Sequence, residues 1–202
     1  MIKIMCKQNS PEWWAEKLGK PSASHFDNIM TSRGEVSKSR QGYLYELAAQ
    51  IVSGIRPETF TSSAMEEGTR REPESRALYE MLYDVSVEQV GICFPDEWKL
   101  YSCSPDGIIN DYRGLELKNV LPKTQVEYLL GGTLPAKYHG QVQGSLLVTG
   151  FDRWDFLSYS PGLPPLIVEV HRDEAYISKL AVALDDFAAD LQRTVAKLRA
   201  IK

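Results

Sequence analysis

Two carboxylates and a lysine, Asp106, Glu116 and Lys118, are spaced so that they could bind a divalent cation and hydrolyse a phosphodiester. The stretch that begins at Ser104 and ends at Lys118 consists of two β-prone runs around a polar turn, which predicts a β-hairpin. If the turn is centred on Asp111, Asp106 and Glu116 lie equally far from it and face each other. Directly opposed side chains have Cβ atoms about 4.5–5.5 Å apart.

A pair of carboxylates at this distance indicates a metal site. The two charges repel, which costs stability unless a cation lies between them. Oxygen ligands favour Mg²⁺, with Mn²⁺ as a substitute. Strand side chains alternate, so Lys118 lies on the face of Glu116, close to any water that the metal binds, whereas Leu117 offers only its backbone carbonyl. We therefore interpret Asp106, Glu116 and Lys118 as the centre of a metal-dependent nuclease site.

The same residues also allow a purely structural interpretation. An exposed hairpin can carry Asp, Glu and Lys as a cross-strand set of salt bridges, and the spacing of these three residues is a weak signal by itself. Pro105, directly before Asp106, favours the functional interpretation, because proline in a strand marks an edge or an irregularity.

The composition fits one globular domain, since the 202 residues are 43% hydrophobic and 25% charged. No apolar run approaches the roughly 20 residues of a membrane span, and Lys3 and Lys7 interrupt the apolar residues of the N-terminus. We therefore expect no membrane association and a cytoplasmic location in a bacterial or phage-infected cell. The three cysteines have no CxxC spacing and the three histidines are far apart. Both observations argue against zinc, an iron–sulfur cluster or a disulfide framework.

The charge distribution is uneven. The chain has 23 Lys and Arg against 27 Asp and Glu, a net charge of −4, and this speaks against nucleic-acid binding because phosphate contacts need cations. Basic residues nevertheless gather between Arg33 and Arg40 and again at Arg70, Arg71 and Arg76. Such asymmetry permits a basic surface on an acidic protein, although ordinary solvated charges explain it equally well.

Periodicity and capping signals predict helices on both sides of the hairpin. We expect them over residues 11–18, from Ser22, over 43–53 before Gly54, over 63–82 with a kink at Pro73, and between Pro135 and Gly150. Residues 173–200 carry apolar side chains at intervals of three and four, which predicts a long helix packed over a sheet. Strands are expected at 85–94, 99–109, 115–120, 154–160 and 166–171. This order predicts an α/β (α+β) fold with a central mixed β-sheet flanked by helices.

Pro105-Asp106, nine residues and then Glu116-Leu117-Lys118 resemble the PD-(D/E)xK nuclease signature. The wider context is similar to the phage lambda-type exonuclease family, which includes the YqaJ-like viral recombinases, through residues 104–107, 114–118, 130–132, 141–143 and 172–174. The resemblance covers roughly residues 10–190. It implies one nuclease domain over residues 1–202 with a restriction-endonuclease-like core. Its parts would be an N-terminal helical DNA-end-binding part over about 1–83, a catalytic core over about 84–171 and a C-terminal helix over about 173–200.

The resemblance implies a Mg²⁺-dependent exonuclease that digests one strand of linear double-stranded DNA from 5′ to 3′. It would leave a 3′ single strand for a single-strand annealing protein and act as a ring-shaped homotrimer. Asp106 and Glu116 would be metal ligands together with the carbonyl of Leu117, and Lys118 would be the catalytic lysine. Two alternatives remain open: an endonuclease with the same core, and a non-catalytic protein that binds DNA ends and recruits an annealing partner.

The resemblance also assigns residues outside the hairpin. Glu72 matches the family's helix-borne acidic residue near the metals, which makes it a possible further ligand. Gln141 matches the glutamine of the last motif, and Lys137, one turn earlier, shares its helix face. Without the resemblance, Glu72 and Gln141 would be interpreted as solvated surface residues. Arg33, Arg70 and Arg71 are further candidates for contacts with DNA.

Residues 18–24 resemble the family's N-terminal segment, whose serine helps to bind the 5′-terminal phosphate. That serine corresponds to Ser24, in the first turn of an expected helix, where free backbone N–H groups favour an anion. A plain capping role for Ser22 and Ser24 remains an alternative. Lys17 stands where the family commonly has arginine, and a lysine supplies a point charge without the bidentate fork.

Overall fold

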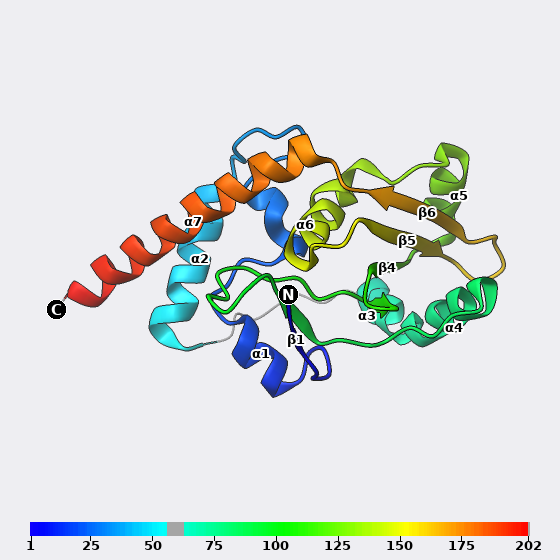
Figure 1. Ribbon diagram of the computed structural model, residues 1–202, viewed down its shortest axis with the longest axis horizontal. Helices are drawn as coiled ribbons and strands as arrows, with labels where there is room; N and C mark the ends of the chain where they lie inside the picture. Colours follow the sequence, from blue (N-terminus) through cyan, green and yellow to red (C-terminus); the bar gives the residue numbers. More distant parts are fainter. Residues whose placement is uncertain (56–62, 202) are drawn as a thin grey trace.

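A four-stranded mixed sheet forms the centre of the computed structural model, which describes residues 1–55 and 63–201 (Figure 1). The strand order is β3-β4-β5-β6, with β4 parallel to β5 and the two outer pairs antiparallel. The strands are β3 (Gly107–Ile109), β4 (Arg113–Asn119), β5 (Arg153–Tyr159) and β6 (Leu166–His171). The predicted mixed sheet flanked by helices is confirmed.

The hairpin of β3 and β4 has the predicted register. Gly107 pairs with Leu115, and the backbone N–H of Asp106 donates to the carbonyl of Leu115 over 3.1 Å. Asn110 and Asp111 form the turn at positive φ, a conformation that Asn and Asp tolerate better than other side chains. β3 has only 3 residues and β4 has 7. Within the described residues, the last residues of β4 therefore have no strand beside them on the β3 side.

Most of the predicted helices are present, with one changed. The N-terminal half contains α1 (Pro11–Lys17), the 3-10 helix η1 (Ala23–Asn28), α2 (Arg40–Ser53), α3 (Ser63–Arg70) and α4 (Glu72–Tyr83). We expected a single helix with a kink at Pro73, but the chain breaks at Arg71 into two helices. Pro73 lies in the first turn of α4, where its missing N–H needs no intrahelical partner.

Four elements differ from the sequence prediction because their stabilising contacts are not periodic. β1 (Ile2–Ile4), which was not expected, pairs antiparallel with β2 (Ile92–Phe94). The strands expected over 85–94 and 99–109 are mostly isolated bridges, such as Cys93 with Cys103. The unexpected α5 (Pro122–Gly131) turns polar side chains inward: Gln125 is buried and donates to the carbonyls of Ser158 and Pro164. A polar buried face leaves no apolar stripe in the sequence.

The prediction that the last helix packs over the sheet is wrong. α7 (Glu174–Ala200) lies along α2 and against the start of α6 (His139–Thr149), which follows the 3-10 helix η2 (Ala136–Tyr138), and its end extends away from the sheet (Figure 1). α6 already contacts β4 and β5, so α7 covers the helical layer instead.

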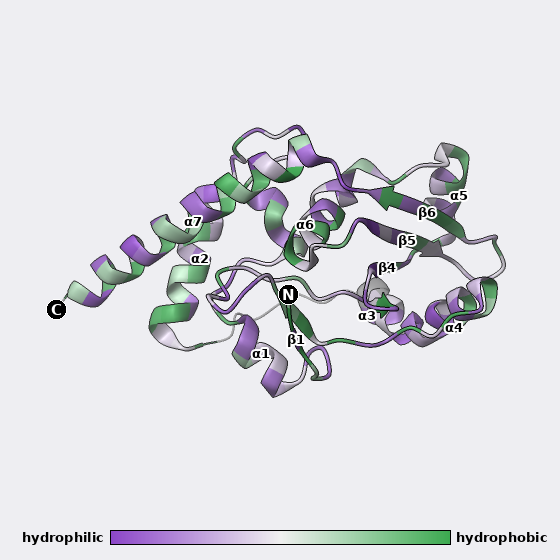
Figure 2. Cartoon of the chain, viewed as in Figure 1, coloured by the Kyte–Doolittle hydropathy of each residue, from purple (hydrophilic) through white to green (hydrophobic). Residues whose placement is uncertain are grey.

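Hydropathy follows this arrangement of the helices. The hydrophobic and hydrophilic bands of α7 in Figure 2 match its buried stripe, which joins the α2 side chains Tyr43, Leu44 and Leu47 in one core cluster. No helix in residues 1–55 or 63–201 has both the length and the apolar character of a membrane span.

The packing of α2 against α7 can be tested at Phe187, which is fully buried and stacks on Tyr43 with ring centroids 5.7 Å apart. We expect Phe187→Ala to lower the free energy of unfolding by about 3–5 kcal/mol, because it leaves a cavity. Val182→Ala, at a position 62% exposed on the same helix, should change it by less than about 0.5 kcal/mol. Urea unfolding measures both. Equal effects would show that α7 does not pack on α2 as described.

Candidate active site

Asp106 occupies the place that a longer β3 would have taken beside β4. Its Oδ2 accepts the backbone N–H of Leu117 over 2.6 Å. In an antiparallel ladder a residue directs its N–H and its C=O toward the same neighbour. The carbonyl of Leu117 therefore also faces the side on which Asp106 lies. The early end of β3 thus places two kinds of oxygen donor together at an open edge of the sheet.

Glu116 contributes the second carboxylate and is almost completely buried. Its Oε1 accepts from Nζ of Lys118 over 2.5 Å and from Nε2 of Gln141 on α6 over 2.6 Å. On another side, the Lys118 ammonium lies 5.1 Å from the centre of the Tyr138 ring, within the range of a cation–π interaction. The structure therefore brings Asp106, Glu116, Lys118 and Gln141 into one cluster, although they come from three separate segments: the loop before β3, β4 and α6.

Glu72 reaches this cluster from the first turn of α4 but is held by a neighbour. Its carboxylate pairs with Arg76, one helical turn later, and Arg76 also donates to the backbone carbonyl of Asp106 over 3.3 Å. Among the described residues, no group of three His, Cys, Asp or Glu side chains is arranged to hold a metal ion. The oxygen donors that β4 and its edge offer are the carboxylates of Asp106 and Glu116 and the carbonyl of Leu117. Glu72 is not part of this set in the arrangement observed.

The electrostatics of the cluster show an excess of negative charge. Burial raises the pKa of Asp106 well above its ordinary value, and the charge of Glu116 raises it further, while Lys118 opposes both. Burial lowers the pKa of Lys118, but Glu116 and Asp106 outweigh it, so that the pKa is raised and the ammonium stays charged. A divalent cation would relieve the repulsion between the carboxylates, and an all-oxygen donor set suits Mg²⁺. The residues present therefore fit a magnesium ion.

The cluster opens into a pocket of about 790 Å³, a volume typical of pockets that hold small organic ligands. Arg71 and Lys137, two predicted DNA-binding residues, line it together with Asp106, Leu117 and Lys118. Arg70 is exposed, pairs with Glu67 over 2.7 Å and does not line this pocket. Arg33 is exposed in the loop after η1 and does not line it either. The structure thus brings only part of the predicted basic set to the cluster.

Lys17 and Ser22 line a second, smaller pocket of about 80 Å³ between α1, η1 and α2. Ser24 does not line it, but its Oγ lies 3.3 Å from Oγ of Ser22. The free backbone N–H groups that we expected in the first turn of η1 are largely in use. The N–H of Ala23 donates to the carbonyl of Ser102 over 2.9 Å, and that of His25 donates to Ser22 over 2.8 Å. The groups that could bind an anion in this pocket are therefore side chains rather than the free N–H groups of a helix N-terminus.

Sequence analysis did not identify two residues of the larger site, Arg76 and Tyr138. The Tyr138 ring lies beside Lys118 and packs on Phe156, with ring centroids 5.1 Å apart. Both residues carry a signal that helical spacing could have revealed, because Arg76 follows Glu72 by one turn and Tyr138 precedes Gln141 by one turn. The signal is usable only once Glu72 and Gln141 are themselves recognised.

Residues 12–152 match the family model of the YqaJ-like viral recombinase domain. This span includes Asp106, Lys118 and Gln141 and all the residues that line the smaller pocket. The chain belongs to this family. The YqaJ-like chain is 30% identical to an alkaline exonuclease, LHK-Exo, from Laribacter hongkongensis, with 94% of this chain and 96% of that chain covered and a TM-score of 0.85. It is therefore a nuclease of the exonuclease type.

A phage-related exonuclease from Haemophilus somnus 129PT has the same fold as this YqaJ-like chain. The two are 12% identical, with a TM-score of 0.68 over 89% of this chain and 96% of that chain. Comparison with functionally curated proteins gave no match. The mixed sheet and its helices are thus shared well beyond recognisable sequence similarity.

Asp106→Asn tests whether the cluster binds a cation. The amide oxygen can still accept the N–H of Leu117, but the charge is lost. A raised pKa means that the ionised carboxylate destabilises the fold once the pH exceeds the ordinary value for Asp, so in EDTA at neutral pH the variant should unfold at a higher temperature than the parent. Mg²⁺ at 100 times its Kd should stabilise the parent by about 2.7 kcal/mol and the variant by much less.

Thermal unfolding with and without Mg²⁺ measures both effects. Asp186→Asn, at an exposed position of α7, is the matched control and should respond to Mg²⁺ as the parent does. Equal stabilisation of the parent and Asp106→Asn by Mg²⁺ would contradict a metal site at Asp106.

Proposed function

We propose that this chain is a Mg²⁺-dependent exonuclease that digests one strand of linear double-stranded DNA from 5′ to 3′ and leaves a 3′ single strand for an annealing protein in recombination. The observation that carries the proposal is the buried Glu116 and the partly buried Asp106 with Lys118 at the open edge of β4. LHK-Exo also has a structure with dAMP, a mononucleotide of the kind that an exonuclease releases.

Asp106, Glu116 and the carbonyl of Leu117 would hold Mg²⁺, with Mn²⁺ as a substitute. The bound ion would neutralise charge on the scissile phosphate and supply a water of lowered pKa. Lys118 would leave Glu116 and turn its ammonium toward the phosphate, where it orients the attacking water and neutralises the charge that develops. Before substrate binds, the ion pair with Glu116 and the Tyr138 ring hold this ammonium in place, and the charges of Glu116 and Asp106 keep it protonated against the effect of burial.

Gln141 and Glu72 would act through the carboxylates rather than on the substrate directly. Gln141 donates to Glu116, which fixes the orientation of that carboxylate when Lys118 moves. Arg76 links Glu72 to the backbone of Asp106, and both carboxylates line the larger pocket, so Glu72 would be a possible further ligand if Arg76 released it. Arg71 and Lys137 on the pocket wall would contact the DNA backbone, and the exposed Arg33 and Arg70 would contact flanking duplex.

The smaller pocket supports the proposed direction of digestion. Ala23, which follows the pocket residue Ser22, donates to the carbonyl of Ser102, and the Cα atoms of Ser102 and Asp106 lie at most about 14 Å apart because four residues separate them. Lys17 lies 4.3 Å from the centre of the Trp13 ring, and no carboxylate of the described residues pairs with it. We propose that Lys17 and Ser24 bind the 5′-terminal phosphate while the next phosphodiester lies at Asp106.

The acidic net charge of −4 bears on how such an enzyme stays on DNA. A closed ring needs less electrostatic attraction than an open surface, so we propose a homotrimer around the duplex, as the family resemblance implies. Residues 1–202 would act as one nuclease domain, with the part before about residue 84 binding the DNA end. β1 and β2 pair across that boundary, which ties the two parts together.

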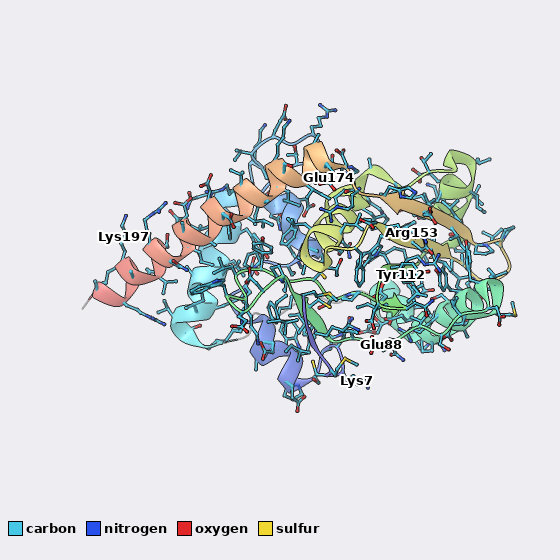
Figure 3. The ribbon with its side chains drawn as sticks, viewed as in Figure 1. Lys7, Glu88, Tyr112, Arg153, Glu174 and Lys197 are labelled. Carbon is cyan, nitrogen blue, oxygen red and sulfur yellow. The ribbon has the colours of Figure 1, made fainter. Side chains whose placement is uncertain are left out.

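Lys118→Ala tests the proposed chemistry. We expect it to lower nucleotide release from linear, 5′-phosphorylated duplex in Mg²⁺ by about 10²–10³-fold, because charge stabilisation of the transition state is lost. The matched control is Lys197→Ala, at an exposed residue near the far end of α7 (Figure 3), and it should act as the parent does. A rate for Lys118→Ala equal to that of the parent would remove Lys118 from the mechanism.

A closed circular duplex separates the alternatives in the same assay. The proposal requires that the circle stays intact while the linear duplex is lost. Cleavage of the circle would identify an endonuclease. Tight binding of ends by the parent without any loss of DNA would identify a non-catalytic recruiting protein.

The pH dependence tests the role of Lys17. Burial lowers the pKa of Lys17 to about 8, so its charge is present below that pH and is lost above it. We expect kcat/KM on 5′-phosphorylated ends to fall as the pH rises above about 8. Lys17→Arg should not show this fall, because a guanidinium stays protonated. If the pH profiles of the parent and Lys17→Arg coincide, Lys17 does not bind the phosphate.

A further inference from the structure

His25 lies at the smaller pocket and has no part in the sequence analysis. Its Nδ1 lies 2.9 Å from Oγ of Ser24 and 3.4 Å from Oγ of Ser22, and its ring stacks on Tyr43 with centroids 5.9 Å apart and an interplanar angle of 16°. These contacts fix the ring. Among the described residues no hydrogen bond to its Nε2 is formed, although His25 lines the pocket. Nε2 is therefore the atom of this ring that is available to a ligand.

The charged groups around His25 are of both signs. Lys17 and Lys20 line the pocket from α1 and the loop that follows it. On α2, Glu46 lines the pocket but accepts from Gln50 over 3.3 Å. Asp27 lies on η1 and Tyr43 on α2. Burial and the charge of Lys17 lower the pKa of His25, and Asp27 opposes them. The pocket thus holds two lysine ammonium groups beside the His25 ring, and a bound anion would favour the protonated form of all three side chains.

We propose that His25 is a second cationic ligand of the 5′-terminal phosphate and sets the preference of the enzyme for phosphorylated over hydroxyl ends. This inference rests on the proposed function, in which the 5′ end is bound at this pocket. Lys17 supplies one point charge and lacks the fork of an arginine. A protonated His25 adds a second charged donor at Nε2, so that two cations meet a terminal phosphate that carries nearly two negative charges at neutral pH.

Protonation of His25 also changes what Ser24 does. With a proton on each ring nitrogen, His25 donates from Nδ1, and Oγ of Ser24 accepts. The hydroxyl hydrogen of Ser24 is then free to point at the phosphate. The proton comes from solvent and stays on the imidazole while the phosphate is bound, so phosphate binding is coupled to proton uptake. A hydroxyl end has no charge to drive this uptake.

The experiment measures end binding without metal, so that it does not depend on catalysis. A duplex closed at one end by a hairpin loop carries either a phosphate or a hydroxyl at its single 5′ end, and fluorescence anisotropy in EDTA gives the Kd of each. We expect the parent to prefer the phosphorylated end and His25→Ala to reduce this preference by about tenfold or more. His25→Gln keeps a neutral donor and should lose most of the preference as well.

His171→Ala is the matched control, because this histidine on β6 has a side chain that is 69% exposed and lines neither pocket. It should keep the preference of the parent. His25 is itself exposed, so its variants should fold, and thermal unfolding checks this. Calorimetry in two buffers of different ionisation enthalpy should show proton uptake on binding of the phosphorylated end by the parent and less uptake by His25→Gln.

An unchanged preference in both His25 variants would overturn the inference, as would equal affinity of the parent for the two ends. Loss of affinity for both ends alike would also overturn it, since His25 would then act only through the shape of the pocket. If the parent prefers phosphorylated ends but digests no DNA in Mg²⁺, the proposed function fails while the assignment of His25 stands. The two failures are therefore distinguishable.

Discussion

The rest of the site depends on the early end of β3. Because β3 has 3 residues and its partner β4 has 7, the backbone of Leu117 needs another partner for its N–H, and Asp106 provides it. This bond fixes one carboxylate beside the next, Glu116, in a largely buried place where their charges repel. The repulsion lowers the stability of the fold, but the same two carboxylates attract a cation strongly. We therefore propose the exposed strand edge as the cation-binding site.

The two pockets are coupled through the segment that leads to Asp106. Ala23 binds the backbone of Ser102, and Nε1 of Trp13 donates to Ser104 over 3.0 Å, so α1 and η1 are fixed to the residues directly before Asp106. An exonuclease needs a constant distance between the site that binds the end of the strand and the phosphodiester that it hydrolyses. Hydrogen bonds between the segments that carry the two sites would supply such a spacing without a separate domain.

The sequence predicts the hairpin well because its chemistry and its geometry are local. One turn fixes the register, and the register places Asp106, Glu116 and Lys118. It predicts less where burial is polar or partners are distant. α5 buries Gln125 instead of an apolar stripe, and β1 forms only through pairing with β2 far along the chain. The apolar stripe of α7 predicts a buried face but not which layer covers it. Likewise, neither Tyr138 nor His25 is identifiable until the fold has placed it beside Lys118 or Ser24.

The central claim is that Asp106, Glu116 and the carbonyl of Leu117 hold a divalent cation. Anomalous diffraction from crystals of the active protein grown with Mn²⁺ tests it most directly. The account predicts an anomalous peak within about 2.3 Å of all three oxygen donors, with the Lys118 ammonium no longer paired with Glu116. A peak bound elsewhere, with the ion pair of Lys118 and Glu116 intact, would contradict it.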